Sequence, residues 1–234
     1  MSNFLISSLA CALLLAGVCP AQAQSASEER PVASFSRLSV RNGIDVYLTQ
    51  SDRERLRIEV QGIELEDVMT EVDGDELKLY RAGPIGDGFF AHKRIAVYLD
   101  FVQLVAIEAS GGSDIATSDD IALDRLDVRA SGGSDVAFDV QAESLELTLS
   151  GGSDLRARGR ARSLRVDASG GSDVSATSLD AERVVLRLSG GSDASIRATE
   201  AIEIDASGGS DVEVHGNPAE RRVRNDRSSD VYWN

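Results

Sequence analysis

A five-residue motif, Ser-Gly-Gly-Ser-Asp, occurs six times between Ser110 and Asp211. Its aspartates are Asp114, Asp135, Asp154, Asp173, Asp193 and Asp211, so that successive copies lie 18 to 21 residues apart. A degenerate seventh copy, Ser228-Ser229-Asp230, follows 19 residues later. Self-similarity at a nearly fixed period in this range is the signature of a repeat architecture. The motif therefore constrains the fold more strongly than any local propensity does.

Apolar and polar residues alternate on both sides of each motif. Around the second copy, Leu126 and Val128 precede the glycines, and Val136 and Phe138 follow the aspartate. Alternation with a period of two predicts strands that bury one face. Each repeat is therefore expected to contain a strand, a glycine corner, a second strand and a short connection. No window from 35 to 234 supports a long amphipathic helix, so the predicted fold is all-β.

Two all-β architectures accommodate this repeat, namely a parallel β-helix and an antiparallel meander. A two-residue Gly-Gly hairpin would pair Ala130 with Asp135 and so mix buried with exposed positions, although a bulged three-residue loop would repair the register. Stacked coils are favoured by the outward column Glu108, Arg129, Thr148, Asp167, Arg187 and Asp205. Adjacent charges in this column alternate in sign and would pair ~4.8 Å apart in a parallel stack. We predict a parallel β-helix-like solenoid with about 19–20 residues per coil.

The chain divides into segments of different character. The expected organisation is a signal peptide (1–23), a linker (24–34), an N-terminal β segment (35–109), the repeat solenoid (110–216) and a degenerate coil or cap (217–234). The first segment is uncharged, contains the apolar run Leu5 to Val18, and ends in Ala21-Gln22-Ala23, which predicts cleavage between Ala23 and Gln24. Both cysteines lie in this segment, so the mature chain would contain no disulfide. Removal of the apolar run would also leave the mature chain without a transmembrane segment.

Three fragments together resemble the bacterial head-GIN domain, a domain of unknown function described as the head of an autotransporter adhesin. They are Asn42-Gly43-Ile44-Asp45-Val46, the turn Asp73-Gly74-Asp75-Glu76-Leu77, and the Ser-Gly-Gly-Ser-Asp corners. The resemblance covers residues 34 to 216. It implies a right-handed β-helix-like fold, a location in the cell envelope and an adhesive role.

Stacked coils would align the motif aspartates in a column, where like charges ~5 Å apart repel by about 1 kcal/mol in water. One solution is structural: each carboxylate accepts hydrogen bonds from the backbone N–H groups of its glycine turn, and the serines form hydroxyl ladders. The alternative is bound Ca²⁺, which prefers clustered carboxylate and carbonyl oxygens. Asp114, Asp135, Asp154, Asp173, Asp193 and Asp211 are thus candidate metal ligands, and no other cofactor is expected.

Aromatic residues gather in one loop, Gly83 to His92, where Phe89, Phe90 and His92 are candidates for contact with a ligand. The alternative is that the phenylalanines cap an end or side of the solenoid, as Tyr232 and Trp233 could cap the far end.

Charge and the distribution of chemically active residues bear on whether the chain binds nucleic acid, catalyses a reaction or acts as a binding module. The balance of 39 acidic and 24 basic residues argues against a nucleic-acid-binding surface, which needs patches of lysine and arginine. The acidic residues are spread evenly by the repeat, and neither His92 nor His215 lies beside a nucleophile motif, so we expect no enzyme. We predict an exported binding or adhesion-type module of the periplasm or cell surface, whose partner is an envelope protein, a polysaccharide or a host surface. A structural or stress-associated periplasmic protein is the alternative, and a polysaccharide-active β-helix enzyme is a minor one.

Overall fold

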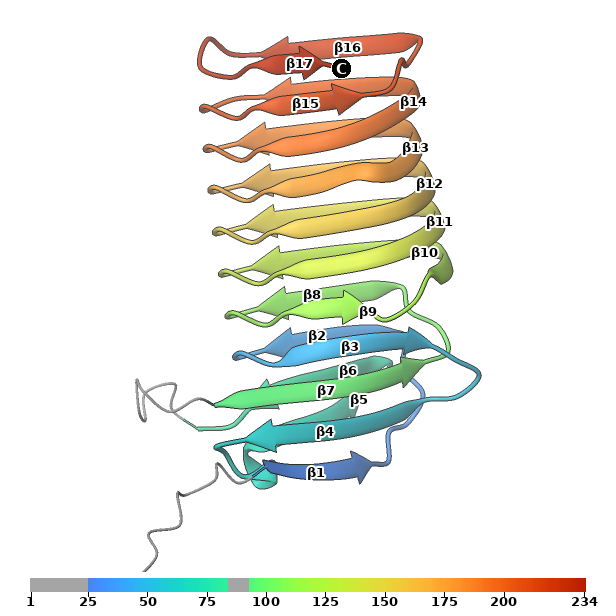
Figure 1. Ribbon diagram of the computed structural model, residues 1–234, viewed down its shortest axis with the longest axis vertical. Helices are drawn as coiled ribbons and strands as arrows, with labels where there is room; N and C mark the ends of the chain where they lie inside the picture. The colour runs from blue at the N-terminus through green and yellow to red at the C-terminus, as the bar shows by residue number, and fades with distance from the viewer. Residues whose placement is uncertain (1–24, 84–92) are drawn as a thin grey trace, which may run out of the picture.

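The computed structural model describes residues 25–83 and 93–234, which form a stack of β-coils (Figure 1). The described residues contain seventeen strands and one short 3-10 helix, η1 (Leu65–Asp67). The strands are β1 (Ser25–Arg30), β2 (Arg37–Arg41), β3 (Asp45–Gln50), β4 (Arg55–Gln61), β5 (Val68–Asp73), β6 (Glu76–Arg81), β7 (Arg94–Phe101), β8 (Ala106–Ser110), β9 (Ile115–Thr117), β10 (Ile121–Ser131), β11 (Val136–Ser150), β12 (Leu155–Ser169), β13 (Val174–Ser189), β14 (Ala194–Ala206), β15 (Val212–His215), β16 (Glu220–Asn225) and β17 (Val231–Trp233).

Each central repeat forms one coil with two flat sides. β11 begins directly after Asp135, runs along one side, bends near Ala142, and returns along the other side to Ser150. β11 and β12 pair in parallel, with Val136 beside Leu155 and Ser150 beside Ser169. The parallel solenoid predicted from the repeat is confirmed, and the hairpin meander is wrong. We call the outer surface of the segments that follow each aspartate the front face, and that of the segments that precede each Ser-Gly-Gly the back face.

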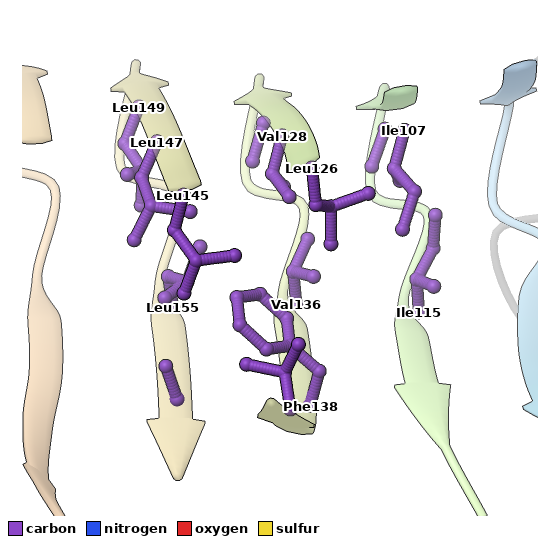
Figure 2. Packing of buried hydrophobic residues seen from close by; sticks show 14 of the residues in the cluster. Ile107, Ile115, Leu126, Val128, Val136, Phe138, Leu145, Leu147, Leu149 and Leu155 are labelled. Carbon is purple, nitrogen blue, oxygen red and sulfur yellow. The ribbon is translucent and has the colours of Figure 1, made fainter. Parts of the chain in front are cut away.

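The core is the space between the two sides of the stack. Alternate residues of each strand point into it, as Figure 2 shows for Val128, Val136, Phe138, Leu147 and Leu155. All five are at most 4% exposed. The columns of apolar residues predicted from the alternation are therefore confirmed as a continuous core. Its stability is expected to come from the contacts between neighbouring coils.

The first coils do not follow chain order. β2 pairs in parallel with both β6 and β8, and β3 pairs in parallel with both β7 and β9. The coil β2–β3 is thus inserted between β6–β7 and β8–β9, although β4 to β7 follow it in sequence. Asn42 and Gly43 form its corner with φ angles of 68° and 73°, in the left-handed region that the motif glycines also adopt.

Antiparallel strands end the solenoid on the N-terminal side (Figure 1). β4 pairs with β7 and with β1, and β5 pairs with β6. Residues 25–30, which were expected to belong to a linker, form β1. Their sequence Ser-Ala-Ser-Glu-Glu-Arg carries no alternating apolar pattern, so the strand depends on the backbone partners that the edge of β4 offers.

A short, degenerate coil closes the C-terminal end of the solenoid. β16 pairs with β14 and β17 with β15, both in parallel. Trp233 lies in the inward column of Val214, and the guanidinium of Arg221 lies 4.2 Å from its ring centroid. Trp233 therefore covers part of the end, although 37% of its surface remains exposed. Tyr232 does not cover it, because it lies beside Glu213 on the front face and is 54% exposed.

Candidate binding surfaces

The second serine of each motif is buried inside the corner. Alternate residues share one side of a strand, so this serine points inward like the apolar residue two positions later. In the described residues Ser113, Ser134, Ser153, Ser172, Ser192 and Ser210 are 0% exposed. The backbone N–H of each serine donates to the Oγ of the next, at 3.1 to 3.3 Å, and the ladder ends on Ser229. The predicted serine ladder exists, and its donors are backbone groups.

The glycine N–H groups of the corners do not bind the motif aspartates as we expected. The second glycine of four corners donates to the glycine carbonyl of the next coil instead, as Gly133 does to Gly151 at 3.2 Å, whereas Gly208 and Gly209 of the last corner donate to Asp226 and Ser228. The aspartates bind one another's backbone: Asp114 Oδ1 accepts from the N–H of Asp135 at 3.2 Å, and Asp193 Oδ1 from that of Asp211 at 3.0 Å. Each of these carboxylates thus bonds to the backbone of the adjacent corner.

The motif aspartates lie along the edge of the stack, and most of them are exposed. Among residues 25–83 and 93–234, no three Asp, Glu, His or Cys side chains are grouped closely enough to hold a metal ion. The calcium hypothesis remains a prediction to be tested. Five other predicted residues lie outside the described residues: Phe89, Phe90 and His92 in the aromatic loop, and Ala23 and Gln24 at the signal cleavage site.

Two tyrosines stack on the front face near the N-terminal end. β3 and β7 place Tyr47 beside Tyr98, with ring centroids 5.2 Å apart and an interplanar angle of 23°. The guanidinium of Arg57 lies 4.2 Å from the Tyr98 centroid, and Arg94 donates to the Tyr47 hydroxyl at 3.1 Å. Stacking and cation–π contacts of this kind fix the rings while leaving Tyr98 37% exposed.

Tyr98 also borders two surface hollows. One, of about 410 Å³, is lined by β1, β4 and β7, and the other, of about 600 Å³, extends towards Thr49 and Asp100. A larger hollow of about 670 Å³ lies at the opposite edge of the solenoid. There, Arg162 is already paired with Glu143 at 2.8 Å. Aromatic surface and open space therefore coincide at the tyrosine pair, as they also do at Tyr232, which lines a hollow of about 430 Å³ near the C-terminal end.

A row of arginines crosses the front face further along the stack. Arg156, Arg158 and Arg160 are alternate residues of β12, and all three are exposed. None of their side chains forms a hydrogen bond or an ion pair with any residue that the structure describes. The alternation Arg-Ala-Arg-Gly-Arg is visible in the sequence, but our sequence analysis did not single it out.

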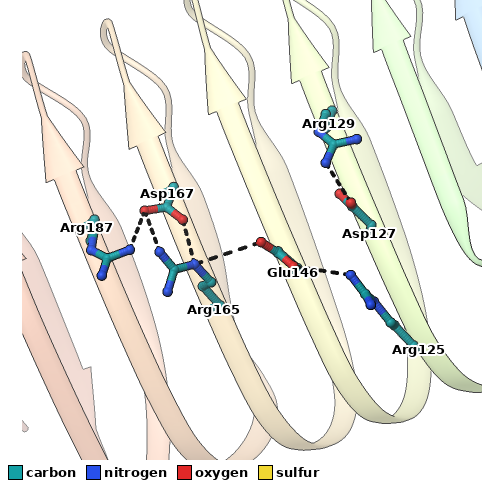
Figure 3. A network of polar contacts seen from close by, with 7 residues as sticks. All are labelled: Arg125, Asp127, Arg129, Glu146, Arg165, Asp167 and Arg187. Atoms are coloured by element: carbon teal, nitrogen blue, oxygen red, sulfur yellow. Dashed lines mark hydrogen bonds and ion pairs between the residues drawn. The ribbon is translucent and has the colours of Figure 1, made fainter.

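Charges on the back face, in contrast, satisfy one another across coils (Figure 3). Glu146 lies 3.5 Å from Arg125 and 3.9 Å from Arg165, and Asp167 lies 2.8 Å from Arg165 and 3.6 Å from Arg187. The predicted column of alternating charges is confirmed in register. The first expected ion pair of the column, between Glu108 and Arg129, does not form, because Arg129 instead binds Asp127 of its own strand at 2.7 Å.

The fold and these surfaces define a parallel β-solenoid of repeated corners with two outward faces. The model of the family described as "Putative auto-transporter adhesin, head GIN domain" matches residues 34–218, and the chain belongs to this family. The resemblance predicted from the sequence is thereby confirmed. No curated protein matches the chain. Among the described residues, no helix is long and apolar enough to span a membrane.

Solved structures share this fold at low sequence identity. A putative adhesin from Bacteroides fragilis has a TM-score of 0.80 at 18% identity, with 90% of this chain and 97% of that chain covered. A putative adhesin from Parabacteroides distasonis gives 0.73 at 19% identity, covering 91% and 98%. A putative lipid binding protein from the same species gives 0.71 at 15% identity, covering 90% and 96%. At these identities the similarity shows the fold alone.

Proposed function

We propose that this protein is an exported, non-catalytic adhesion-type module that binds an extended ligand through its front face. The observation that carries the proposal is the stacked pair Tyr47–Tyr98, which presents a fixed aromatic surface beside two hollows. Membership of an adhesin head family supports the same class of function. The ligand would be a polysaccharide, an envelope protein or a host surface, met in the periplasm or outside the cell.

The tyrosine pair is suited to recognition because both rings are already fixed before a ligand binds, so that the protein need not rearrange. Both rings are held by strands in the middle of a sheet, since β3 lies between β7 and β9. Tyrosine presents a large amphipathic contact with few rotatable bonds, so little entropy is lost when a ligand binds. The Tyr98 ring lies between the Tyr47 ring and the Arg57 guanidinium, so a ligand would meet its exposed edge and hydroxyl, with Arg94 and Asp100 lining the adjoining hollows.

An array of polysaccharides, phospholipid vesicles and envelope extracts, probed with the protein lacking residues 1–23, tests this function. The variant Tyr47→Ala/Tyr98→Ala is expected to bind about tenfold more weakly than the wild type, because each aromatic contact contributes about 0.5–1.5 kcal/mol. Tyr232→Ala removes a tyrosine that is more exposed than Tyr98 and lies at the far end of the stack, and it should leave binding unchanged. Equal binding by wild type and double variant would contradict the proposal, as would turnover of the bound polysaccharide.

A further inference from the structure

The guanidinium groups of Arg156, Arg158 and Arg160 are the starting point. Arg156 and Arg158 line one hollow of the front face, and Arg160, which follows Gly159 with its φ of 110°, lines the large hollow at the edge of that face. None of the three side chains is bound to another residue that the structure describes. Alternate residues of a strand lie ~6.6 Å apart, so the backbone of the row spans at most ~13 Å. Three unpaired cations in a row are unexpected in a chain with a net charge of −15, where acidic partners are abundant.

The neighbours of the row keep it accessible. Ala137 and Ser175 flank Arg156 in the adjoining coils, and both are too small to cover its side chain. The acidic residues around the row are Asp139 beside Arg158, Asp180 beside Arg160, and Asp154 two positions before Arg156. Asp180 is engaged by Arg197 at 3.8 Å, and none of the three forms an ion pair with the row. The arginines thus keep their donors free for an external anion.

The contrast with the back face indicates that this arrangement is not a general property of the solenoid. In the same coil, Arg165 is bonded to Asp167 and lies within 3.9 Å of Glu146 (Figure 3). A coil of this fold can therefore pair its arginines where neighbouring positions carry acids. On the front face, Asp139 and Asp180 adjoin Arg158 and Arg160 in the neighbouring coils, yet neither forms an ion pair with them.

We propose that this arginine row binds the carboxylates of an acidic polysaccharide. The assignment rests on the proposed function, and it names the ligand class for the front face. Arginine presents a planar fork of donors that matches a carboxylate. Duplex DNA carries one charge per ~1.7 Å, a density that three guanidiniums over ~13 Å do not match. A polymer with one carboxylate per sugar or disaccharide offers sparse charges.

The row and the tyrosine pair share one strip of the front face. Tyr47, Ala116, Ala137 and Arg156 are consecutive members of one outward column. Three steps of ~4.8 Å separate the backbone of Tyr47 from that of Arg156, or ~14 Å in total. The two alanines between them have small side chains, which do not obstruct the surface between Tyr47 and Arg156. An extended polymer can therefore contact the aromatic pair and the arginines at the same time.

Calorimetric titration with polygalacturonate, alginate and hyaluronate tests the inference, with methyl-esterified polygalacturonate as the neutral counterpart. The wild type is expected to bind at least one acidic polymer about tenfold or more tightly than Arg156→Gln/Arg158→Gln/Arg160→Gln does. The matched control, Arg37→Gln/Arg224→Gln/Arg227→Gln, changes the net charge equally at exposed positions away from the front face and should bind like the wild type. Raising the salt concentration should weaken wild-type binding more than that of the arginine-row variant.

Several outcomes would overturn the inference. They are no binding of any acidic polymer, equal binding of the esterified polymer, equal weakening by both triple variants, or preferential binding of anionic phospholipid vesicles or duplex DNA. The proposed function fails separately. If polymers bind in a manner that depends on Tyr47 and Tyr98 but not on the arginines, the front-face function stands and the assignment of carboxylates is wrong.

Discussion

The backbone N–H of Ser134 donates a hydrogen bond to the Oγ of Ser153 in the next coil, at 3.2 Å, and both residues are completely buried. This contact links the two corners inside the core, where no water replaces a lost partner. The motif is thus an architectural device: its glycines adopt left-handed backbone angles, and its second serine satisfies the buried N–H of the preceding corner.

Replacing one ladder serine should measurably destabilise the solenoid. In Ser153→Ala the buried N–H of Ser134 loses its acceptor, which is expected to cost about 1–3 kcal/mol of unfolding free energy. Ser150→Ala, at the partly exposed first serine of the same motif, should cost less than about 0.5 kcal/mol. Denaturant unfolding of the two variants checks this. Equal stability of Ser153→Ala and wild type would show that the ladder contributes little.

Two glycines of one coil should differ in their tolerance of alanine. A Cβ on Gly159 would lie 2.1 Å from the carbonyl oxygen of Val140, whereas one on Gly152 would meet nothing within 4 Å. Gly152→Ala should cost only the left-handed backbone angle, about 1–2 kcal/mol. Gly159→Ala must also displace the adjacent strand and should cost about 3 kcal/mol or more. Thermal melts that rank the two variants in the opposite order would contradict the close approach.

Asp226 should make the C-terminal coil sensitive to acid. The backbone N–H of Gly208, with the hydroxyls of Ser228 and Ser229, lowers the pKa of Asp226 from 3.8 to about 2. Because the folded pKa is depressed, the stabilisation is complete above about pH 4 and is lost as the pH falls through about 2. Hydrogen exchange of the Gly208 amide should therefore lose protection over this range.

A matched amide serves as the control for this titration. The Gly152 N–H donates to the carbonyl of Gly170, which does not titrate, so its protection should not change in the same range. In Asp226→Asn the Gly208 amide should show weakened protection that no longer depends on pH. If the protection of the wild-type Gly208 amide stays constant over this pH range, as that of Gly152 should, the role of the Asp226 carboxylate is contradicted.

Calcium is not expected to stabilise the corner edge. Asp114, Asp193 and Asp211 accept hydrogen bonds from neighbouring backbone N–H groups, and no metal-sized cluster lies among the described residues. Melting midpoints with millimolar calcium and with a chelator should therefore agree, since a ligand raises the midpoint only by binding the folded state. A rise with calcium but not with magnesium would restore the aspartate column as a metal site.

The repeat predicts most of the solenoid because each strand position recurs. Alternation around Asp135 and Asp154 identifies the inward columns, and the same parity would have identified Ser134 and Ser153 as buried, had it been extended across the corner. The coil β2–β3 could be recognised only as a turn at Asn42-Gly43. Its insertion between β6–β7 and β8–β9 leaves no trace in a sequence period, because strands that follow it in the chain lie beneath it.

The candidate site was harder to predict because it includes N-terminal strands that the sequence repeat does not cover. Tyr47 and Tyr98 meet across β3 and β7, which no repeat relates to each other, so their stacking depends on a register that sequence alternation does not determine. The arginine row was within reach, since Arg156, Arg158 and Arg160 alternate along one strand. These arginines form no ion pair although Asp139 and Asp180 adjoin them, and that depends on side-chain placement that the alternation does not determine.

Hydroxyl-radical footprinting of the protein with and without its bound polysaccharide tests most directly whether the front face is the recognition surface. We predict that Tyr47 and Tyr98 become protected on binding, while Tyr232 and Trp233 at the far end keep their reactivity. Protection confined to Tyr232 and Trp233, or unchanged reactivity of Tyr98 at saturating ligand, would contradict recognition by the tyrosine pair of the front face.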